Sequence, residues 1–411
     1  MALRQRQKRV VVTGVGIITA HGMGYGENLV AMKEGRDSIG PITAFDASAY
    51  RGTLGGEVKG FSFDRPLTRL RRSRLDRSSL MLLAAFDEAL AMAGLDKIND
   101  PIYMALGTTL GGMLSGQRYH GMGIEKGFDK TKASLLTDYL AHSQAANLME
   151  EYGLKGQART FSDACASGTN AIGSAFEKIR SGAFDIAISG GYDTMCEFTF
   201  AGFNSLQAVT PERCRPFDKE RDGLVLGEGA GLLILEDMEY ARRRGAAVLG
   251  EVTGYGTSSD AFHSTRPDPE ARGAVAAINT ALESAGVSPG DIDYINAHGT
   301  ATPYNDLMEA RAIAKVFGKC DGQEGVPVSS VKSMIGHLLG ASGAVEAISA
   351  LMAIREGFIP PNINCGEVDP ECNVNISTEP NCSAPLKRAI SNSFGFGGAN
   401  ACLVLEGAAG A

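Results

Sequence analysis

The sequence predicts an α/β protein in which buried strands alternate with helices. Residues 8–18 (KRVVVTGVGII) and 184–191 (FDIAISGG) are apolar, β-branched runs interrupted or ended by glycine, a pattern typical of strands covered on both faces. Residues 77–94 (RSSLMLLAAFDEALAMAG) carry a broad apolar helical stripe that stops at glycine. Such an alternation favours a mostly parallel sheet with helices on its faces.

An internal duplication indicates that this α/β unit occurs twice. Similar segments recur in the same order: VTGVG (12–16) with VTGYG (252–256), AAFDEALAMAGL (84–95) with AAINTALESAGV (276–287), IYMALGTT (102–109) with DYINAHGT (293–300), and 166–182 with 341–357. We therefore expect two related halves, residues 1–250 and 251–411. They should pack face to face around a pseudo-twofold axis and share one core.

Bulk properties exclude several classes of protein. The chain has 411 residues and a net charge of −8, which argues against general nucleic-acid binding. It has no apolar run long enough to cross a bilayer, and its eight cysteines form no CxxC pair. These features argue against membrane insertion, a zinc site and a disulfide framework. They predict a cytoplasmic protein.

Cys165 lies in DACASGTNAIG (163–173), between a strand end and a helix expected over residues 171–180. Its counterpart in the second half is Gly340. If the two helices are symmetric mates, a nucleophile at the start of one faces polar residues near the start of the other. His298 ends a predicted strand, and Lys332 and His337 lie in the segment that leads into the mate helix.

This arrangement suits a reactive thiol. Free N–H groups and the dipole at a helix N-terminus stabilise a thiolate, so we expect a lowered pKa for Cys165. A neighbouring His would lower that pKa further and move protons. Backbone N–H groups near Cys165 and in the glycine-rich turn of SNSFGFGGAN (391–400) could stabilise a thioester oxyanion.

Each residue also has an ordinary structural interpretation. A free Cys in an apolar region is usually inert core, and a lone His at a strand end is usually a satisfied structural group. Lys332 could lie at the surface, and Phe394 and Phe396 could be core aromatics. The functional interpretation is favoured over the structural one because these residues occupy corresponding places in a duplicated unit.

Four motifs, DACASGTNAIG, NAHGTATPYND, KSMIGHLLGASGAVE and NSFGFGGAN, together resemble the elongating β-ketoacyl-[acyl-carrier-protein] synthases of the synthase II type, in the thiolase superfamily. The segment CRPFDKERDGLVLGEGAG (214–231) supports the resemblance, which extends over nearly the whole chain. It implies a duplicated, five-layer α/β/α/β/α thiolase-like fold. The implied activity is decarboxylative Claisen condensation of an acyl chain with a malonyl group in fatty acid elongation, both delivered by acyl carrier protein to a homodimer.

The resemblance also implies roles for individual residues. Cys165 would carry the acyl chain, and His298 and His337 would assist decarboxylation and stabilise the enolate oxygen. Lys332 would orient the His side chains and pair with Glu346. The backbone N–H of Phe396 would join the oxyanion hole, and its ring would gate the acyl tunnel. The remaining implied positions are the pantetheine contacts Thr300 and Thr302, the acyl-pocket residues Leu110 and Phe203, and the supporting residues Asp306 and Phe394.

Two further sites follow from the same resemblance. The basic segment LTRLRRSRLDR (67–77) would dock the acidic carrier protein, although a solvated arginine face is an equally good interpretation. No organic cofactor is required, but a structural Na⁺ or K⁺ would bind at Asn296, Glu346, Ser391 and Asn392. The docking residues are Arg69, Arg71, Arg72 and Arg74, together with Arg77 and with Arg213 and Arg215 as extensions.

Two residues depart from the family pattern. Asp163 stands two positions before Cys165, where the family usually has Thr. Because a carboxylate aimed at the thiol would raise its pKa, we expect Asp163 to point away or be paired. Arg266 occupies a position near the expected entrance where small or polar residues are common.

The sequence leaves three alternative functions open. One is a ketosynthase of a polyketide or polyene pathway. A second is a non-catalytic partner that sets chain length in a heterodimer, which would usually lack the nucleophile. A third is a degradative thiolase, which would need a second catalytic Cys where this chain has Phe394 and Phe396.

Overall fold

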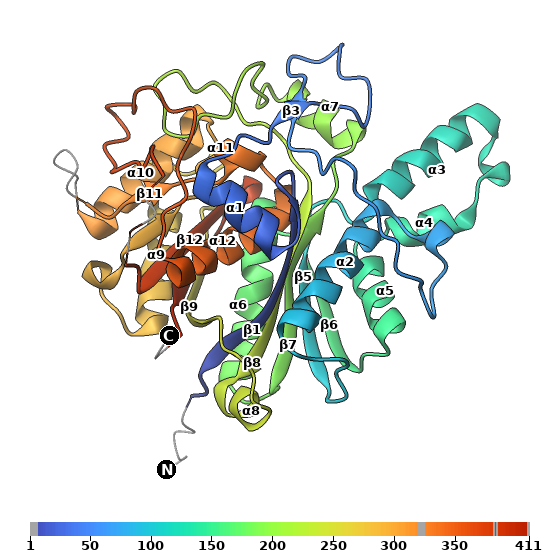
Figure 1. The fold of residues 1–411 in the computed structure, drawn as a ribbon. Helices are drawn as coiled ribbons and strands as arrows, with labels where there is room; N and C mark the ends of the chain where they lie inside the picture. Colours follow the sequence, from blue (N-terminus) through green and yellow to red (C-terminus); the bar gives the residue numbers. More distant parts are fainter. Residues whose placement is uncertain (1–6, 319–324, 381–382, 384, 409–411) are drawn as a thin grey trace.

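The computed structural model describes residues 7–318, 325–380, 383 and 385–408, and Figure 1 shows its fold. Ten strands follow one another across one continuous sheet, and the halves meet where β1 pairs with β9. In the first half the order from the edge is β6 (Gly156–Phe161), β5 (Ile102–Gly107), β7 (Ile186–Asp193), β8 (Gly229–Asp237) and β1 (Val10–Thr19). In the second it is β9 (Gly250–Ser259), β13 (Ala399–Glu406), β12 (Arg388–Gly395), β10 (Tyr294–Asn296) and β11 (Val328–Ser329).

The pairing pattern repeats strand for strand and confirms the predicted duplication. In each half the two inner pairs, β1–β8–β7 and β9–β13–β12, are antiparallel. The two outer pairs, β7–β5–β6 and β12–β10–β11, are parallel. The expectation of a mostly parallel sheet is therefore wrong, because five consecutive antiparallel pairs occupy the centre of the sheet, where the halves join, and parallel pairs are confined to its two ends. A register shift also occurs in corresponding pairs, β1–β8 and β13–β9.

The helices form three layers around the sheet strands, which gives the five-layer thiolase-like arrangement (Figure 1). α2 (Arg77–Met92) and α5 (Ser143–Tyr152) cover the outer face of the first half, and α9 (Arg272–Ala285) and α10 (Pro303–Phe317) cover that of the second. α6 (Ser167–Arg180) and α12 (Ser342–Glu356) lie between the halves and contact strands of both. Three apolar clusters fill the corresponding interfaces.

Sequence signals account for these helices. Asp76 caps α2 by accepting a hydrogen bond from the Ser78 N–H, and Gly286 ends α9 in the left-handed conformation. α6 begins at Ser167, four residues earlier than the sequence predicts, because the run of small residues after Cys165 already adopts helical geometry. α12 is buried over its first thirteen residues, as a helix covered on all sides must be.

Small residues let the two central helices touch at their N-terminal ends. A Cβ added to Gly168 would lie 2.8 Å from the Gly340 carbonyl oxygen, and one added to Gly343 would lie 2.8 Å from the Thr169 nitrogen. The Thr169 and Ser393 hydroxyls hydrogen-bond at 2.7 Å across the halves. The start of each central helix therefore lies at the junction of the two halves.

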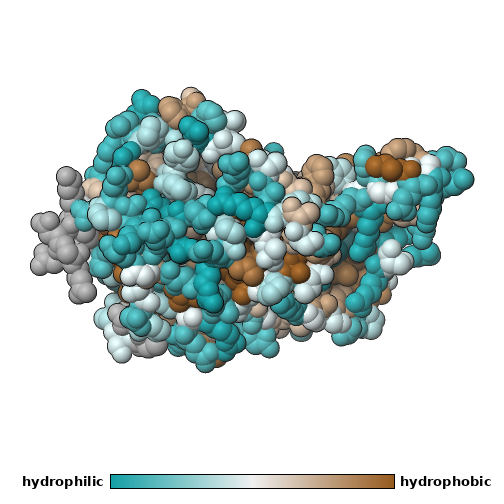
Figure 2. All heavy atoms as spheres, turned by 90° about the horizontal axis from the view of Figure 1, so that it is seen from above, coloured by the Kyte–Doolittle hydropathy of each residue, from teal (hydrophilic) through white to brown (hydrophobic). Residues whose placement is uncertain are grey.

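An arm formed by α3 (Met113–Lys126) and α4 (Ala133–Tyr139) projects from the first half (Figure 1). Hydrophobic side chains are exposed along it, as Figure 2 shows at the end of the projection. The exposed residues are Ile124, Phe128, Leu136 and Leu140. A monomer rarely leaves several large apolar side chains exposed together, which points to an interaction surface.

The remaining elements are short. They include α1 (Tyr25–Glu34), α7 (Glu197–Ser205), α8 (Met238–Arg243), α11 (Lys332–Ile335) and the two-residue strands β2 (Gly22–Met23), β3 (Gly40–Pro41) and β4 (Leu54–Gly55). Among the described residues, no helix has the length and apolar character needed to cross a membrane. Six of the eight cysteines lie among the described residues and are free thiols, whereas Cys320 and Cys382 lie outside them.

Candidate active site

A cavity of about 330 Å³ opens at the junction of the two halves. Cys165, His298 and His337 all line it, although they come from different halves of the chain. The Cys165 sulfur and one ring nitrogen of each His lie within 4.8 Å of one another. All three residues are at least nine-tenths buried, so a group bound among them is shielded from water.

The backbone presents Cys165 at a tight turn. Ala164 has a positive φ of 51°, and the 3₁₀ turn Ala164–Ala166 leads directly into α6. The mate position repeats this geometry. Leu339 has a φ of 55° and begins the turn Leu339–Ala341, which leads into α12. Non-glycine residues rarely adopt such φ values, and backbone strain of this kind concentrates at functional sites.

The predicted lowering of the Cys165 pKa is wrong. Burial raises the pKa of the Cys165 thiol to about 11, although the positive charge of Lys332 and the backbone N–H groups of Phe396 and Cys165 lower it. The helix N-terminus is present, but the desolvation of a thiolate in this enclosed site outweighs it. Cys165 is therefore a neutral thiol near pH 7.

His337 is fixed in one tautomer by its neighbours. The Leu339 N–H donates to its Nδ1 at 2.9 Å, and the Ser342 hydroxyl lies 3.2 Å from the same nitrogen. Because a backbone N–H can only donate, Nδ1 is an acceptor and the neutral ring carries its proton on Nε2. Burial and the charge of Lys332 hold the pKa of His337 well below its usual value, so the ring is neutral.

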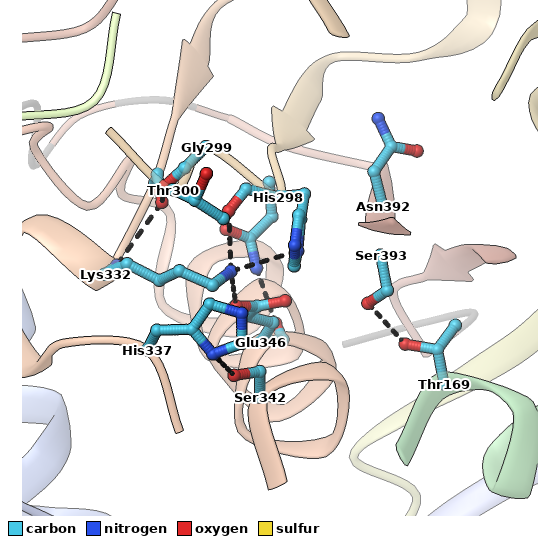
Figure 3. Close-up of polar contacts among 12 residues, drawn as sticks. Thr169, His298, Gly299, Thr300, Lys332, His337, Ser342, Glu346, Asn392 and Ser393 are labelled. Carbon is cyan, nitrogen blue, oxygen red and sulfur yellow. Dashed lines mark hydrogen bonds and ion pairs between the residues drawn. The ribbon is translucent and has the colours of Figure 1, made fainter. Parts of the chain in front are cut away.

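His298 is oriented in the same sense by Lys332. The Lys332 ammonium lies 3.3 Å from His298 Nδ1, donates to the His298 carbonyl at 2.6 Å, and forms a buried ion pair with Glu346 (Figure 3). An ammonium has no lone pair, so His298 Nδ1 accepts and Nε2 carries the proton. Burial, Lys332 and His337 lower the pKa of His298 well below its usual value. The two rings meet edge to face with centroids 5.4 Å apart.

The same three side chains have the spacing of metal ligands, but their hydrogen bonds favour another use. A metal bound at Nε2 needs a proton on Nδ1 and an acceptor facing that proton. Here the Leu339 N–H and the Lys332 ammonium face the two Nδ1 atoms instead. The site is thus a pair of neutral N–H donors beside a thiol, which suits stabilisation of an anionic oxygen.

A second pair of donors surrounds the thiol itself. The backbone N–H groups of Phe396 and Cys165 approach the sulfur and favour its anionic form. Gly395 makes this approach close, because an added Cβ would lie 3.2 Å from the Cys165 nitrogen. The Phe396 ring lines the cavity and stacks on Phe203 with centroids 5.7 Å apart. Phe394 packs edge-on against His298 with centroids 6.0 Å apart.

Thr300 and Thr302 both line the cavity, and their hydroxyls lie 2.9 Å apart. Asp306 is fully buried on α10 and accepts hydrogen bonds from the Thr300 and Phe217 N–H groups. It therefore shapes the loop that carries the two threonines, without touching the cavity.

Sequence reasoning missed Glu309, one turn further along α10. It is fully buried and accepts from the N–H groups of His298 and Gly299, both at 2.8 Å. Burial raises its pKa to about 7. Its spacing from Asp306, three residues along one helix, was the available signal, because both carboxylates then face the end of β10.

Asp193 was also missed. This buried carboxylate at the end of β7 accepts from the N–H groups of Thr109, Leu110 and Gly340, so it ties the two halves together beside the cavity. Burial raises its pKa to about 6. An acidic residue that ends an otherwise apolar strand was the only signal in the sequence.

Leu110 and Asp163, which the sequence analysis also singled out, do not line the cavity. Leu110 is buried in a cluster with Phe200 and Leu339 and does not line the cavity of the single described chain. Asp163 is paired as expected, because it accepts from the Asn170 side chain at 2.9 Å. Tyr255 donates in turn to Asn170 at 2.8 Å.

Before α2 begins at Arg77, the arginine segment contains only the short turn Arg72–Arg74. The side chains of Arg69, Arg71 and Arg74 are exposed and border one surface groove, and no carboxylate among the described residues pairs with them. Arg72 is also exposed, but it donates to the Phe63 carbonyl and lies 3.9 Å from Asp64. Arg77 differs, because it pairs with buried Glu228 at 2.7 Å. The proposed extensions have partners of their own: Asp37 for Arg213 and Glu212 for Arg215.

The four residues proposed for a cation share one property. In each, a buried side-chain oxygen has no hydrogen-bond partner among the described residues: Asn296 Oδ1, Glu346 Oε2, Ser391 Oγ and Asn392 Oδ1. Asn296 and Ser391 are register partners in neighbouring strands, and Asn296 donates to the Glu346 carbonyl at 2.8 Å. Such orphaned oxygens are rare in folded proteins, and hard oxygen ligands suit Na⁺ or K⁺.

We expect a monovalent cation to stabilise the fold through these oxygens. At constant ionic strength, K⁺ or Na⁺ should raise the unfolding temperature by about 3 °C relative to tetramethylammonium. The Asn392→Ala variant should lose this dependence, whereas a matched Asn204→Ala variant on α7 should keep it. Identical unfolding temperatures of the unmodified chain in all three salts would contradict the site.

Comparison with known proteins agrees with the fold and the cavity. Residues 7–241 match the family model "Beta-ketoacyl synthase, N-terminal domain", and residues 249–366 match "Beta-ketoacyl synthase, C-terminal domain". The chain belongs to the β-ketoacyl synthase family.

Individual relatives are similar over almost the full length. A 3-oxoacyl-[acyl-carrier-protein] synthase 2 from Synechocystis sp. is 40% identical, over 97% of this chain and 98% of the relative. Among solved structures, the ishigamide ketosynthase/chain length factor is 36% identical with a TM-score of 0.94, covering 98% of this chain and all of that one. A type II polyketide ketosynthase solved with its acyl-carrier protein is 29% identical with a TM-score of 0.88, at the same coverage.

Proposed function

We propose that this protein is an elongating 3-oxoacyl-[acyl-carrier-protein] synthase. It joins an acyl chain held on Cys165 to the two-carbon unit of malonyl carrier protein in fatty acid elongation. The observation that carries the proposal is the convergence of one thiol and two Nε2–H donors in one buried cavity. The full-length similarity to 3-oxoacyl-[acyl-carrier-protein] synthase 2 supports the choice of substrate.

The first step transfers the acyl group. The Cys165 sulfur forms a bond to the thioester carbonyl, the bond to the pantetheine sulfur breaks, and the thiol proton ends on the departing pantetheine sulfur. The N–H groups of Cys165 and Phe396 stabilise the oxyanion between these events. Because the Cys165 pKa is raised to about 11, the proton must leave as the new bond forms.

The second step makes and uses a carbanion equivalent. The malonyl thioester loses carbon dioxide, and its enolate oxygen receives hydrogen bonds from the Nε2–H groups of His298 and His337. The enolate carbon attacks the acyl thioester, and the Cys165 thiolate leaves and recovers a proton from water. Lys332 and Glu346 act as positioning residues, since they hold His298 with its donor toward the cavity.

The surrounding groups receive supporting roles in the same proposal. Thr300 and Thr302 bind the pantetheine arm, Phe203 lines the acyl pocket, and the Phe396 ring gates it. Asp306 and Phe394 hold the loop and ring around them. Leu110 contributes to the acyl pocket from the partner subunit. No organic cofactor takes part, and the bound Na⁺ or K⁺ is structural. Free thiols among the described cysteines fit a cytoplasmic location.

The three alternatives differ in testable ways. Two structural relatives are ketosynthases with a chain length factor or a polyketide carrier, so a polyketide or polyene pathway remains the second candidate. A chain-length partner without activity fits poorly, because Cys165 and both His side chains are in place. A thiolase fits poorly as well, because Phe394 and Phe396 occupy the segment where it would need a second Cys.

Product analysis tests the function. The purified protein receives malonyl carrier protein and a panel of acyl carrier proteins of different chain length, and mass spectrometry identifies the products. We expect saturated fatty-acyl chains extended by two carbons. Extension of polyene or aromatic starters alone would support the second candidate, and no acyl-enzyme with any starter would contradict the proposal.

Carrier protein docks on the exposed arginines in this proposal. Reversing two of them, in the double variant Arg71→Glu with Arg74→Glu, should raise KM for acyl carrier protein about tenfold and flatten its salt dependence. Acylation by a small pantetheine thioester should not change, since the cavity is untouched. The control pair Arg242→Glu with Arg243→Glu on α8 should behave like the unmodified protein, and equal KM values in both pairs would place docking elsewhere.

The protein acts as a homodimer in this proposal. β6 is an edge strand, paired only with β5 among the described strands and mostly exposed, so its outer N–H and C=O groups are free to pair with a second copy. The exposed hydrophobic residues of the α3–α4 arm offer further contact area. Sedimentation at micromolar concentration should give twice the chain mass of 43.1 kDa, and a single-chain mass would contradict it.

A further inference from the structure

Arg266 lies at the rim of the catalytic cavity, over the ring of Tyr304. The guanidinium carbon is 4.9 Å from the ring centroid, both side chains are exposed, and both residues line the cavity. Cys165 lies in the buried part of the same cavity and is only 7% exposed. The stacked pair therefore lies between solvent and the thiol.

The loop that carries Arg266 is held against the glycine-rich turn Phe396–Gly398 at the cavity. His263 Nδ1 accepts from the Thr265 N–H at 3.1 Å and from the Arg266 N–H at 3.3 Å. The Gly397 N–H donates to the Ser264 carbonyl at 2.8 Å, next to Phe396. Tyr304 is the second residue of α10, which begins at Pro303 directly after Thr302, so the stacked pair links the Arg266 loop to the start of α10 at the cavity rim.

Arg266 is the only Lys or Arg among the described residues that line the cavity. Both His rings there are neutral, because burial lowers their pKa values. The two carboxylates of the lining have partners elsewhere: Asp222 pairs with Arg51 at 2.8 Å, and Asp260 accepts from Asn400 at 2.7 Å. No carboxylate of the described chain lies within ion-pair distance of Arg266, so its charge is uncompensated.

Stacking leaves the guanidinium ready for an anion. An aromatic ring occupies one face of the guanidinium plane, while the N–H groups lie in that plane and point outward. A planar fork of donors matches two oxygens of a phosphate group. Holding the fork over Tyr304 also reduces the conformational entropy that would be lost on binding.

We propose that Arg266, positioned by Tyr304, binds the phosphate of the phosphopantetheine arm while the thioester end reaches Cys165. This inference rests on the proposed function, because it assumes a pantetheine thioester in the cavity. The phosphate is the one anionic group of that arm, and it joins the end that remains outside the buried thiol. Arg266 thus selects phosphorylated pantetheine over the uncharged form.

Small thioesters with one fixed acyl chain test the proposal. Acyl-pantetheine, acyl-phosphopantetheine and acyl-coenzyme A each react with the protein below saturation, and mass spectrometry follows acylation of Cys165. We expect phosphopantetheine to react roughly tenfold faster than pantetheine, as one charge-assisted phosphate contact warrants. Arg266→Gln should remove this preference without changing the rate with acyl-pantetheine, and Arg266→Lys should keep part of it.

A matched control comes from α8, where Arg243 is also exposed and stacks over Tyr240 at 5.7 Å, away from the cavity. Arg243→Gln should keep the full preference. Tyr304→Phe should retain the preference and Tyr304→Leu should weaken it, because only the first preserves the stacked ring.

The outcomes separate this inference from the proposed function. No acylation by any thioester would defeat the proposed function itself. Acylation at equal rates by pantetheine and phosphopantetheine would overturn the role of Arg266 and leave the function intact. A further Arg266-dependent gain with coenzyme A would assign the contact to the coenzyme A diphosphate and overturn its assignment to the carrier arm.

Discussion

Replacing Cys165 with alanine should abolish the acyl-enzyme and lower condensation by at least about 10³-fold, because Cys165 is the one thiol among the described residues that line the cavity. The Cys165 sulfur lies within 4.8 Å of a ring nitrogen of each His. Mass spectrometry after incubation with acyl carrier protein should detect no adduct. Decarboxylation of malonyl carrier protein should persist, since the two Nε2–H donors remain.

A second buried cysteine provides the control. Cys402 is fully buried in β13 and does not line the cavity, so Cys402→Ala should retain acylation. The raised pKa of Cys165 adds a kinetic signature: alkylation by iodoacetamide should keep rising with pH through 9, without the plateau of an activated thiolate. Full condensing activity in Cys165→Ala would remove the basis of the mechanism.

Replacing His298 with alanine should separate the two steps. Condensation and release of carbon dioxide from malonyl carrier protein should fall about 10²–10³-fold, the usual cost of losing one oxyanion donor. Acylation of Cys165 should fall by less than about tenfold, because its oxyanion is stabilised by backbone N–H groups. Measuring acyl-enzyme by mass and carbon dioxide by isotope release distinguishes these effects.

His21 is the matched control for His298. It is buried, its pKa is lowered to about 4 by burial, and its Nδ1 contacts the Ser38 hydroxyl at 2.8 Å, outside the cavity. His21→Ala can lower stability, but it should leave the ratio of acylation to decarboxylation unchanged. A proportional loss of both steps in His298→Ala would show that this side chain supports structure and donates to no enolate.

The sequence predicts the duplication well because repeated segments keep their order, and the strand pairing repeats with them. It also predicts which side chains meet, since Cys165 and Gly340 occupy mate positions before mate helices. Strand direction was missed because apolar runs covered on both faces look alike in parallel and antiparallel sheets. The family resemblance supplied the cation ligands, and their unpartnered oxygens are visible only in three dimensions.

Electrostatics was the least predictable property. The helix N-terminus beside Cys165 suggested a lowered pKa, but the sequence carries no measure of how completely the thiol is enclosed. The roles of Glu309 and Asp193 could not be predicted from the sequence for a related reason. Glu309 accepts from backbone N–H groups 10 and 11 residues away, across the loop before α10, and Asp193 accepts from segments 83 to 147 residues away. In both cases only the folded chain shows which N–H groups the carboxylate faces. The arginine run predicts one exposed basic face that includes Arg77, yet the Arg77 side chain pairs with buried Glu228.

The crowding at Gly340 limits how this architecture can change. A Cβ at that position would lie 2.6 Å from the Thr108 backbone, so even the smallest thiol-bearing side chain has no room there. A second nucleophilic cysteine therefore cannot occupy the mate position of Cys165. Backbone packing alone restricts the nucleophile to the first half of the duplicated chain.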